Sequence, residues 1–219
     1  MSKYGILWEY NSFVDLDPFP MIPAAAMWVY DGFLVNNMLS QFQTAGVTSV
    51  LVVCETGAIF LGEAIQGCPE MYNLMSFVYF SDLDNRGGAQ LLKHIIITAV
   101  HDKTSPILLA PGHIVSELSL QSVEDEHKKK NTRKKKKFLA TVVVVPGKNE
   151  TELNVPDGYR LTSIAVIESD IVRHILPQKS SLLDVFSEAE KNKQLNYYVF
   201  DGLMYECEDE QAIACLSPQ

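Results

Sequence analysis

Apolar runs of strand length alternate with helical patterns along most of this chain, and no other feature of the sequence restricts its fold as strongly. The clearest example has apolar residues at helical spacing from Leu34 to Phe42, a helix stop at Ala45-Gly46, and then the apolar strand Ser49–Val53. Such units build parallel sheets with helices on their faces. We therefore predict an α/β fold: a single three-layer, Rossmann-like domain over residues 1–219, with a mainly parallel sheet.

The same patterns predict the other elements of this sheet. Further strands are expected at residues 4–8, 77–80, 106–110, 139–145, 161–167 and 195–200. Further helices are expected at residues 58–65, 89–97, 118–130, 171–176, 182–190 and 208–216. The segment Thr141–Val145 is apolar after its first residue, which is typical of a strand buried on both faces. In sheets of this kind, small molecules bind beyond the carboxyl ends of the parallel strands.

The charge of the chain is unevenly distributed. A basic, solvent-exposed insert at residues 128–137 carries eight of the 18 basic residues: Lys128, Lys129, Lys130, Arg133, Lys134, Lys135, Lys136 and Lys137. Without them, ten basic residues face 27 acidic ones, a net charge of −17 that argues against a general nucleic-acid coat. The run either binds RNA, an acidic partner or anionic lipid, or is a solvated insertion. It contains no aromatic residue, so base stacking is not indicated.

The cysteines and the apolar segments indicate the compartment. The four cysteines form no C-x-x-C pair and have no metal-ligand spacing, so we expect a reducing compartment. The N-terminal residues lack a charged segment followed by a long apolar run, and no stretch has the eighteen or so apolar residues that a membrane span needs. We expect a cytoplasmic protein without a membrane partner.

Five fragments resemble, in the same order, the nucleotidyltransferase domain of the sugar-1-phosphate nucleotidyltransferases. They are Phe19–Pro23 (K-P-M-I-P in the family), Met38–Val53 (helix, A-G-V, strand), Asn85–Ala89 (G-T-A-G-A), Leu108–His113 (L-V-L-x-G-D) and Tyr198–Gly202 with the helix expected after it (F-x-G-x-W-x-D-I-G-T-P-E). The resemblance covers nearly the whole chain and implies a fold of the nucleotide-diphospho-sugar transferase type. In the family a sugar phosphate attacks the α-phosphorus of a nucleoside triphosphate, and pyrophosphate leaves. That reaction needs a glycine-rich basic loop and a Mg²⁺ held by carboxylates.

The loop after the first strand departs from the family pattern. The family has G-G-x-G-T-R there, whereas residues 9–17 contain neither a glycine nor a basic residue. We interpret Glu9, Asp15 and Asp17 as surface acids of this loop, and they would repel a triphosphate. Phe19 replaces the lysine that precedes the family's proline. The sequence therefore predicts that the triphosphate contacts are lost.

The positions that would bind the metal and the sugar are also altered. His113 stands where the family has a metal-binding aspartate, and a neutral imidazole is a poor ligand for Mg²⁺. We favour a hydrogen-bonded histidine at a strand end. Glu206 falls at the second aspartate position and remains acidic, while the family's E-K-P motif has no counterpart between Thr141 and Ile167. We predict no catalytic residue, no metal site and no cofactor; Mg²⁺ or a nucleotide enters only in the alternative functions below.

The pattern also offers candidate residues for a vestigial nucleotide site. Its residues would be Gly87, Gly88, Gly112, His113 and Glu206. Gly87-Gly88 could hold a phosphate at a helix N-terminus, although a plain turn before a helix is the commoner use of such a pair. The site residues are therefore candidates for binding without chemistry.

The function that the resemblance implies is assembly with other protein subunits. Residues Asp84–Ile96 and the position of the lysine-rich insert look most like the gamma subunit of the guanine-nucleotide exchange factor for eukaryotic translation initiation factor two, a non-catalytic relative. Expected partners are other subunits of a complex, with RNA or ribosome contact through the basic run, and no C-terminal β-helix domain is expected. The alternatives are a divergent sugar-1-phosphate nucleotidyltransferase, a nucleotide or metabolite sensor, and a ribosome-associated dormancy factor.

Overall fold

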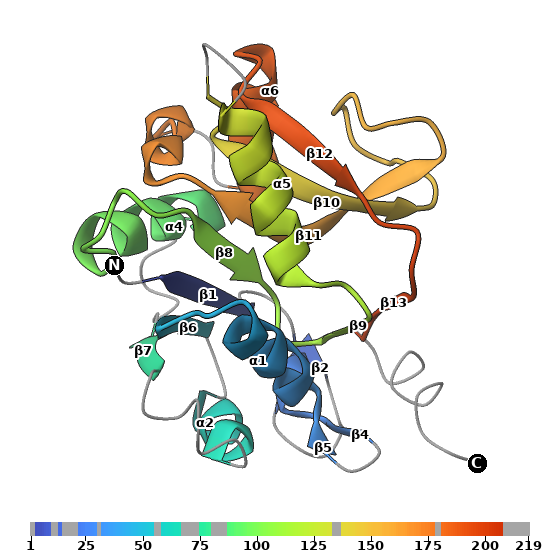
Figure 1. The fold of residues 1–219 in the computed structure, drawn as a ribbon. Helices are drawn as coiled ribbons and strands as arrows, with labels where there is room; N and C mark the ends of the chain where they lie inside the picture. Colours follow the sequence, from blue (N-terminus) through green and yellow to red (C-terminus); the bar gives the residue numbers. More distant parts are fainter. Residues whose placement is uncertain are drawn as a thin grey trace. The chain divides into compact units, whose positions relative to one another are not determined.

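The computed structural model describes residues 3–9, 13–14, 22–29, 32–54, 58–66, 75–79, 87–132, 137–177 and 181–207 (Figure 1). The chain divides into two compact units, each assembled from separate segments. Unit 1 consists of Met1–Tyr4, Asn85–Leu109 and Ser119–Asp201. Unit 2 consists of Gly5–Asp84, Ala110–Leu118 and Gly202–Gln219.

Four strands form the sheet of unit 1, in the order β12 (Leu195–Val199), β10 (Ala140–Pro146), β11 (Tyr159–Ile167), β8 (Ile107–Ala110). β10 and β12 run parallel, whereas β11 is antiparallel to both β10 and β8. The β-branched run of β10 is buried from Ala140 to Val145. This burial agrees with the prediction that an uncharged, apolar strand lies in the interior.

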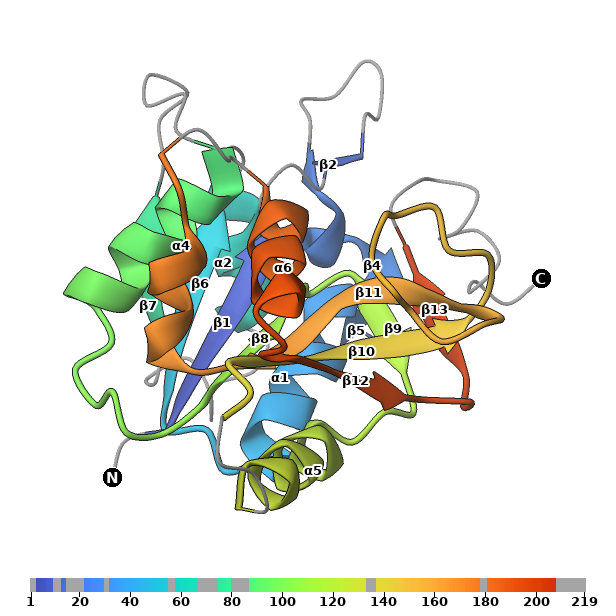
Figure 2. The ribbon, with the colours of Figure 1, turned by 90° about the horizontal axis from the view of Figure 1, so that it is seen from above.

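Helices cover both faces of the unit 1 sheet. α4 (Gly87–Thr98), the 3-10 helix η3 (Ser169–His174) and α6 (Leu182–Lys191) lie on one face, and α5 (Leu120–Thr132) lies on the other (Figure 2). α6 begins with a capping box in which the Ser181 hydroxyl accepts from the Asp184 N–H and the Asp184 carboxylate accepts from the Ser181 N–H. Its apolar residues Val185, Phe186 and Ala189 are buried, at the spacing expected for one helix face.

Unit 2 contains the strands β1 (Tyr4–Glu9), β6 (Ser49–Cys54) and β7 (Met75–Tyr79), adjacent in that order, with β6 and β7 parallel. Every residue of β1 is buried, as are Val50–Cys54. The helices are α1 (Leu34–Thr44) and α2 (Ala58–Gln66). α1 ends where the sequence predicts, because Gly46 has a φ of +72°, a left-handed conformation that favours glycine.

Short paired strands complete unit 2. β2 (Phe13–Val14) pairs with β3 (Ile22–Pro23), β4 (Trp28–Val29) with β5 (Gly32–Phe33), and β9 (Ile114–Ser116) with β13 (Met204–Glu206). The 3-10 helix η1 (Ala24–Ala26) is buried and follows β3 directly. Gly112 and His113, which precede β9, and Glu206 in β13 belong to the candidate site of this unit.

The structure confirms the α/β class and the mainly parallel sheet. The helix expected at residues 171–176 is instead the 3-10 helix η3, and the helix expected at residues 208–216 lies outside the described residues. Within the described part of the chain, no helix is both long and apolar enough to cross a bilayer.

Candidate functional site

Gly112 lies two residues after the end of β8, in a space where an added side chain meets close neighbours. A Cβ atom added there would lie 2.9 Å from the Ala25 Cβ, 3.2 Å from the Val35 Cγ2 and 3.3 Å from the Glu9 Oε1. The first of these separations is shorter than real Cβ contacts, and its partner belongs to a buried 3-10 helix rather than to a flexible side chain. Glycine at this position therefore serves close packing between β1, η1 and α1.

The packing predicts the effect of one methyl group at residue 112. We expect Gly112→Ala to lower the free energy of unfolding by about 1–3 kcal/mol, because the added carbon overpacks a buried contact. The matched control is Gly62→Ala in α2, where an added Cβ meets nothing within 4 Å and alanine favours the helix. Urea denaturation of the two variants and the parent measures the difference. Equal stability of both variants would contradict the packing at Gly112.

Glu9 is the last residue of β1 and its carboxylate is completely buried. Its Oε1 accepts a short hydrogen bond from the Gly112 N–H. Both carboxylate oxygens lie 3.3 Å from the His113 Nδ1, and His113 is itself only 3% exposed. A carboxylate can only accept, so Nδ1 carries the proton that it shares with Glu9. The Gly112 N–H and the His113 Nδ1 thus share the Glu9 carboxylate as their hydrogen-bond acceptor.

This burial corrects the interpretation of Glu9 as a surface acid of the loop, which is wrong. The apolar run of β1 ends at Trp8, and a charged residue directly after such a run usually marks a strand end at the surface. Here the strand continues one residue further, because Gly112 and His113 supply the hydrogen bonds that a buried carboxylate needs. Asp15 and Asp17 lie outside the described residues.

Glu206 lies beside His113 through the pairing of β9 and β13. Glu206 is the register partner of Ile114, and the Cys207 N–H donates to the His113 carbonyl oxygen at 3.0 Å. Unit 2 thus brings together Gly112, His113 and Glu206, three of the five residues that the sequence suggested for a nucleotide site. The side chain of Glu206 is partly buried.

The donor atoms of this cluster fit poorly to the Mg²⁺ that the resemblance implies. Mg²⁺ prefers hard oxygen ligands in octahedral geometry, whereas His113 offers an imidazole whose Nδ1 faces Glu9. Among the described residues, no three or more histidine, cysteine, aspartate or glutamate side chains are placed to hold a metal ion. We therefore assign no step to a metal.

The other two glycines of the suggested site belong to unit 1. Gly87 and Gly88 are the first residues of α4. Gly87 has a φ of +70°, a conformation that turns the chain into the helix and that other residues adopt at a cost. Gly88 is buried. Both glycines therefore have structural uses that require no ligand.

The basic run starts in the last turns of α5. Lys128, Lys129 and Lys130 are exposed, and each is paired on its own helix: Lys128 with Glu124 at 2.7 Å, and Lys129 and Lys130 with Glu126 at 3.2 and 3.6 Å. Partial burial alone would raise the pKa of Glu126, but the ammonium groups of Lys129 and Lys130 lower it on balance. Lys137 is exposed at the other end of the run, and residues 133–136 lie outside the described part.

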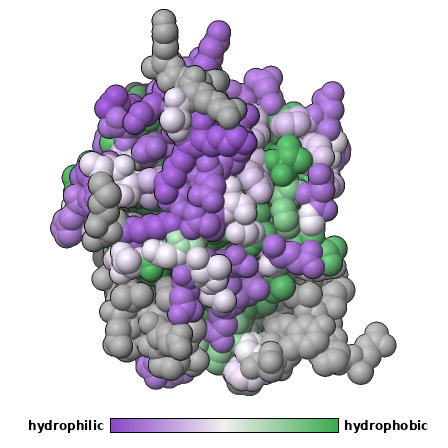
Figure 3. Space-filling model, in the orientation of Figure 1, coloured by the Kyte–Doolittle hydropathy of each residue, from purple (hydrophilic) through white to green (hydrophobic). Residues whose placement is uncertain are grey.

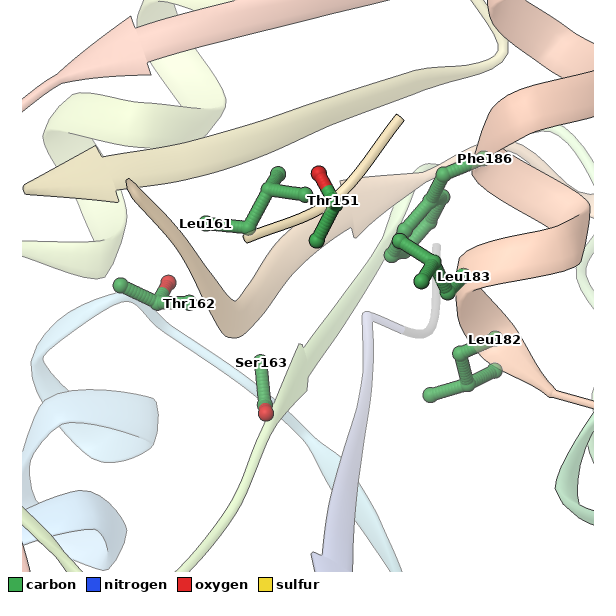
Figure 4. Close-up of a pocket in the computed structure, with 7 residues that line it drawn as sticks. All are labelled: Thr151, Leu161, Thr162, Ser163, Leu182, Leu183 and Phe186. Atoms are coloured by element: carbon green, nitrogen blue, oxygen red, sulfur yellow. The ribbon is translucent and has the colours of Figure 1, made fainter. Parts of the chain in front are cut away.

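Unit 1 contains a cavity of about 200 Å³ that the sequence did not suggest (Figure 4). It lies between the first half of β11 and the start of α6, and its lining consists of Thr151, Leu161, Thr162, Ser163, Leu182, Leu183 and Phe186. The Thr162 hydroxyl already donates to the Val143 carbonyl at 3.0 Å, and the Thr151 hydroxyl donates to Asn149 Oδ1 at 2.8 Å. In the sequence, the pair Thr162-Ser163 interrupts the apolar residues of the strand expected at 161–167.

A second feature of α6 fixes the loop beside this cavity. Glu190 accepts from the Asn154 N–H at 3.1 Å and from the Tyr197 hydroxyl at 2.5 Å. Burial, and then the hydrogen bond to the Glu190 carboxylate, raises the pKa of Tyr197 well above its ordinary value. Tyr197 therefore remains a neutral hydrogen-bond donor to Glu190 at ordinary pH.

The comparisons with known proteins agree with this architecture. No family model and no curated protein matches the sequence. Among solved structures, a protein of Bacillus anthracis assigned as a glucose-1-phosphate thymidylyltransferase, in complex with a sucrose, matches with a TM-score of 0.73 at 14% identity, over 100% of this chain and 96% of that one. UDP-glucose pyrophosphorylase matches in complex with UDP-glucose and in its apo form, with TM-scores of 0.72 and 0.71 at 12% identity, over 97% of this chain and 96% of those chains.

Sequence identities of 12–14% support a shared fold and nothing finer. They nevertheless extend over both units and nearly the full length of the matched chains. The predicted nucleotidyltransferase-like domain agrees with them, whereas closeness to one non-catalytic subunit is not addressed by them. The chain has the fold of the sugar-phosphate nucleotidyltransferases.

Proposed function

We propose that this protein is a non-catalytic member of the nucleotidyltransferase fold that works by binding other macromolecules. One observation carries the proposal: the buried Glu9 carboxylate accepts from the Gly112 N–H and faces the His113 imidazole. These are the groups at the end of β8 that could otherwise meet an anionic substrate. They are already used inside the protein.

The chemistry of nucleotidyl transfer makes this arrangement unfavourable. A triphosphate is stabilised by N–H donors and cations aimed at the developing charge. The Glu9 carboxylate at the end of β1 is negatively charged, like a triphosphate, and would repel it. Residues 9–17 add Asp15 and Asp17, and they contain neither a basic residue nor a glycine. Attraction for a triphosphate is therefore lost both at the buried Glu9 cluster and in the sequence of the loop that follows β1.

The finer assignment is to a multi-subunit complex in the cytoplasm, in the manner of the gamma subunit of the guanine-nucleotide exchange factor for eukaryotic translation initiation factor two. The support for it is sequence resemblance at residues 84–96 and the lysine-rich insert between two core strands. The partners would be other protein subunits. Co-purification of the tagged protein from its own cells would test this assignment, and isolation as a lone monomer would oppose it.

The non-catalytic role is tested by measuring pyrophosphate release. The purified protein is incubated with Mg²⁺, each common nucleoside triphosphate and each common sugar 1-phosphate, beside its Glu206→Gln variant. We expect both proteins to give the same background rate, and we expect no nucleotide to raise the melting temperature, since a ligand of the folded state must stabilise it. Turnover that disappears in Glu206→Gln would overturn the proposal.

A divergent sugar-1-phosphate nucleotidyltransferase is the second candidate. It is favoured by the fold shared with a thymidylyltransferase and a UDP-glucose pyrophosphorylase, and by the adjacency of Glu206 to His113. The same assay separates the candidates. Nucleotide-dependent stabilisation without turnover would point instead to a nucleotide sensor.

A further inference from the structure

β12 is the outermost strand of the unit 1 sheet (Figure 2). In the described part of the chain it pairs with β10 alone, so its other edge has no partner strand. The parallel register with β10 includes every residue of β12 and contains no shift, so the strand is regular to its end. An open edge of this kind presents main-chain donors and acceptors that a further strand can bind.

Alternate residues of β12 direct their main-chain groups toward this open edge. Directly after the strand, the Phe200 N–H donates to the Val144 carbonyl oxygen of β10 at 2.9 Å. The N–H and C=O of one strand residue point to the same side, and those of the next residue point to the other side. The even-numbered residues of β12 therefore bond to β10. The main-chain groups that face outward belong to Leu195, Tyr197 and Val199.

β12 lacks the residues that usually protect an edge strand. Natural sheets block their edges with lysine, proline, a bulge or an inward-pointing charge. The sequence from Leu195 to Val199 contains no charged residue and no proline. Val199 is 42% exposed. Figure 3 shows hydrophilic residues over α5 and a hydrophobic patch beside them, over the end of β12. This edge can therefore accept a strand of another chain.

The outward-facing groups of β12 are arranged symmetrically about Tyr197. Two copies of the strand can lie antiparallel across a twofold axis, with Tyr197 opposite Tyr197 of the second copy. Leu195 then lies opposite Val199 of the second copy, and the same pair recurs on the other side of the axis. Residues that face each other in this way exchange main-chain hydrogen bonds, so the outward groups of both copies are satisfied.

The same register places opposite charges at both ends of the contact. Lys193 lies two residues before β12 and Asp201 two residues after it, and both are exposed. With Tyr197 on the axis, Lys193 of one copy lies across from Asp201 of the second copy. Asp201 accepts from the neutral Tyr159 hydroxyl at 2.8 Å, so its carboxylate keeps the charge that attracts a lysine. A register shifted by two residues loses this match and leaves outward groups unpaired.

From the open edge and this match of charges, we propose that the protein forms a homodimer in which the β12 strands of two copies pair antiparallel about a twofold axis at Tyr197. A second copy is favoured over an extended segment of another protein, because this register satisfies the outward groups and the end charges of both strands at once. The proposal is independent of the non-catalytic role, because Glu9 belongs to unit 2 and β12 to unit 1.

The contact joins two edges rather than two faces, so it buries less than the roughly 1,200 Å² of a stable interface. We therefore expect a weak dimer, with a dissociation constant of roughly 10–100 µM. Sedimentation velocity of the full chain at about 1–200 µM protein and 0.15 M salt measures it. That salt screens the repulsion between copies that each carry a charge of −9. A sedimentation coefficient that stays at the monomer value throughout would overturn the proposal.

The first variant, Val199→Pro, removes an N–H that faces the open edge. Proline is tolerated in an edge strand where its nitrogen points away from the ladder, so we expect a folded protein that dimerises at least roughly tenfold more weakly. The matched control is Phe200→Pro, which removes the N–H that donates to Val144 inside the sheet. We expect it to unfold at a lower urea concentration than Val199→Pro. Parental dimerisation by Val199→Pro, or the reverse order of stability, would contradict the assigned edge.

A reversal of charge tests the register without depending on the fold of the proline variants. Lys193→Glu and Asp201→Lys each place like charges at both ends of the contact, and each alone is expected to dimerise about threefold to tenfold more weakly than the parent. An equal mixture of the two variants restores both opposite pairs, so we expect it to associate as tightly as the parent. A mixture that associates no more tightly than the separate variants would rule out the pairing about Tyr197.

Discussion

Replacing Glu9 by alanine is expected to lower the free energy of unfolding by roughly 2–4 kcal/mol. The substitution leaves the Gly112 N–H and the His113 Nδ1 donor buried without their acceptor, and each unsatisfied buried donor costs about 1–3 kcal/mol. Glu9→Gln keeps one acceptor oxygen, so we expect a smaller loss. Urea denaturation followed by circular dichroism measures all three proteins.

The control for this series is Glu117→Ala, which removes an exposed carboxylate from the same unit. We expect its stability to stay within about 0.5 kcal/mol of the parent. If Glu9→Ala proves no more harmful than Glu117→Ala, the buried cluster does not stabilise the protein. The proposal of an internally occupied site would then lose its main support.

Substitution of His127 by alanine is expected to cost about 3 kcal/mol or more. The imidazole is fully buried, so its removal leaves a cavity and also deprives the Thr141 hydroxyl and the Glu168 carboxylate of a partner. The Asn131 side chain, which bonds to the Phe138 backbone, loses its neighbouring imidazole at the same time. We therefore also expect faster tryptic cleavage within residues 128–137, measured by mass spectrometry at a temperature where the variant remains folded.

The comparison for His127 is His94→Ala, the same change at an exposed position of α4. We expect that variant to unfold within about 0.5 kcal/mol of the parent and to be cleaved at the parental rate. Faster cleavage in both variants would mean that this segment is sensitive to general destabilisation rather than to the loss of His127. Unchanged cleavage in His127→Ala would show that the imidazole does not hold Asn131 against Phe138.

The long elements of the fold could be predicted because their sequence signals are local. The apolar spacing from Leu34 to Phe42 gave α1, and the residues from Leu182 to Glu190 gave α6 to within one residue. Both helices have a strong apolar face, and a continuous apolar run identified β10. The 3-10 form of η3 was missed, since a short apolar repeat does not distinguish it from an α-helix.

The short strands around the site were not predictable in this way. β9 and β13 have three residues each and are stabilised by each other across nearly ninety positions, as in the pair Met204 and Ser116. The residues that flank each of these strands in the sequence do not indicate which strand it pairs with. The resemblance to the family nevertheless placed Glu206 and His113 in corresponding roles, and the structure brings their backbones together.

Burial of Glu9 is the clearest case in which sequence reasoning failed. A single acid after an apolar run is normally exposed, and the donors that reverse this expectation come from a segment 103 positions away. Pairs of a buried carboxylate and a distant histidine can be found in a sequence only after the fold has been assigned.

The division of the chain has a consequence for its synthesis. The backbone passes between the units at residues 4–5, 84–85, 109–110, 118–119 and 201–202, so no continuous fragment contains one whole unit without part of the other. Neither half can therefore be released by a single proteolytic cut or expressed alone by truncation. During translation the strand partner of Ile114 emerges only when Glu206 has been added to the chain. Until then the surface around His113 is incomplete and available to chaperones.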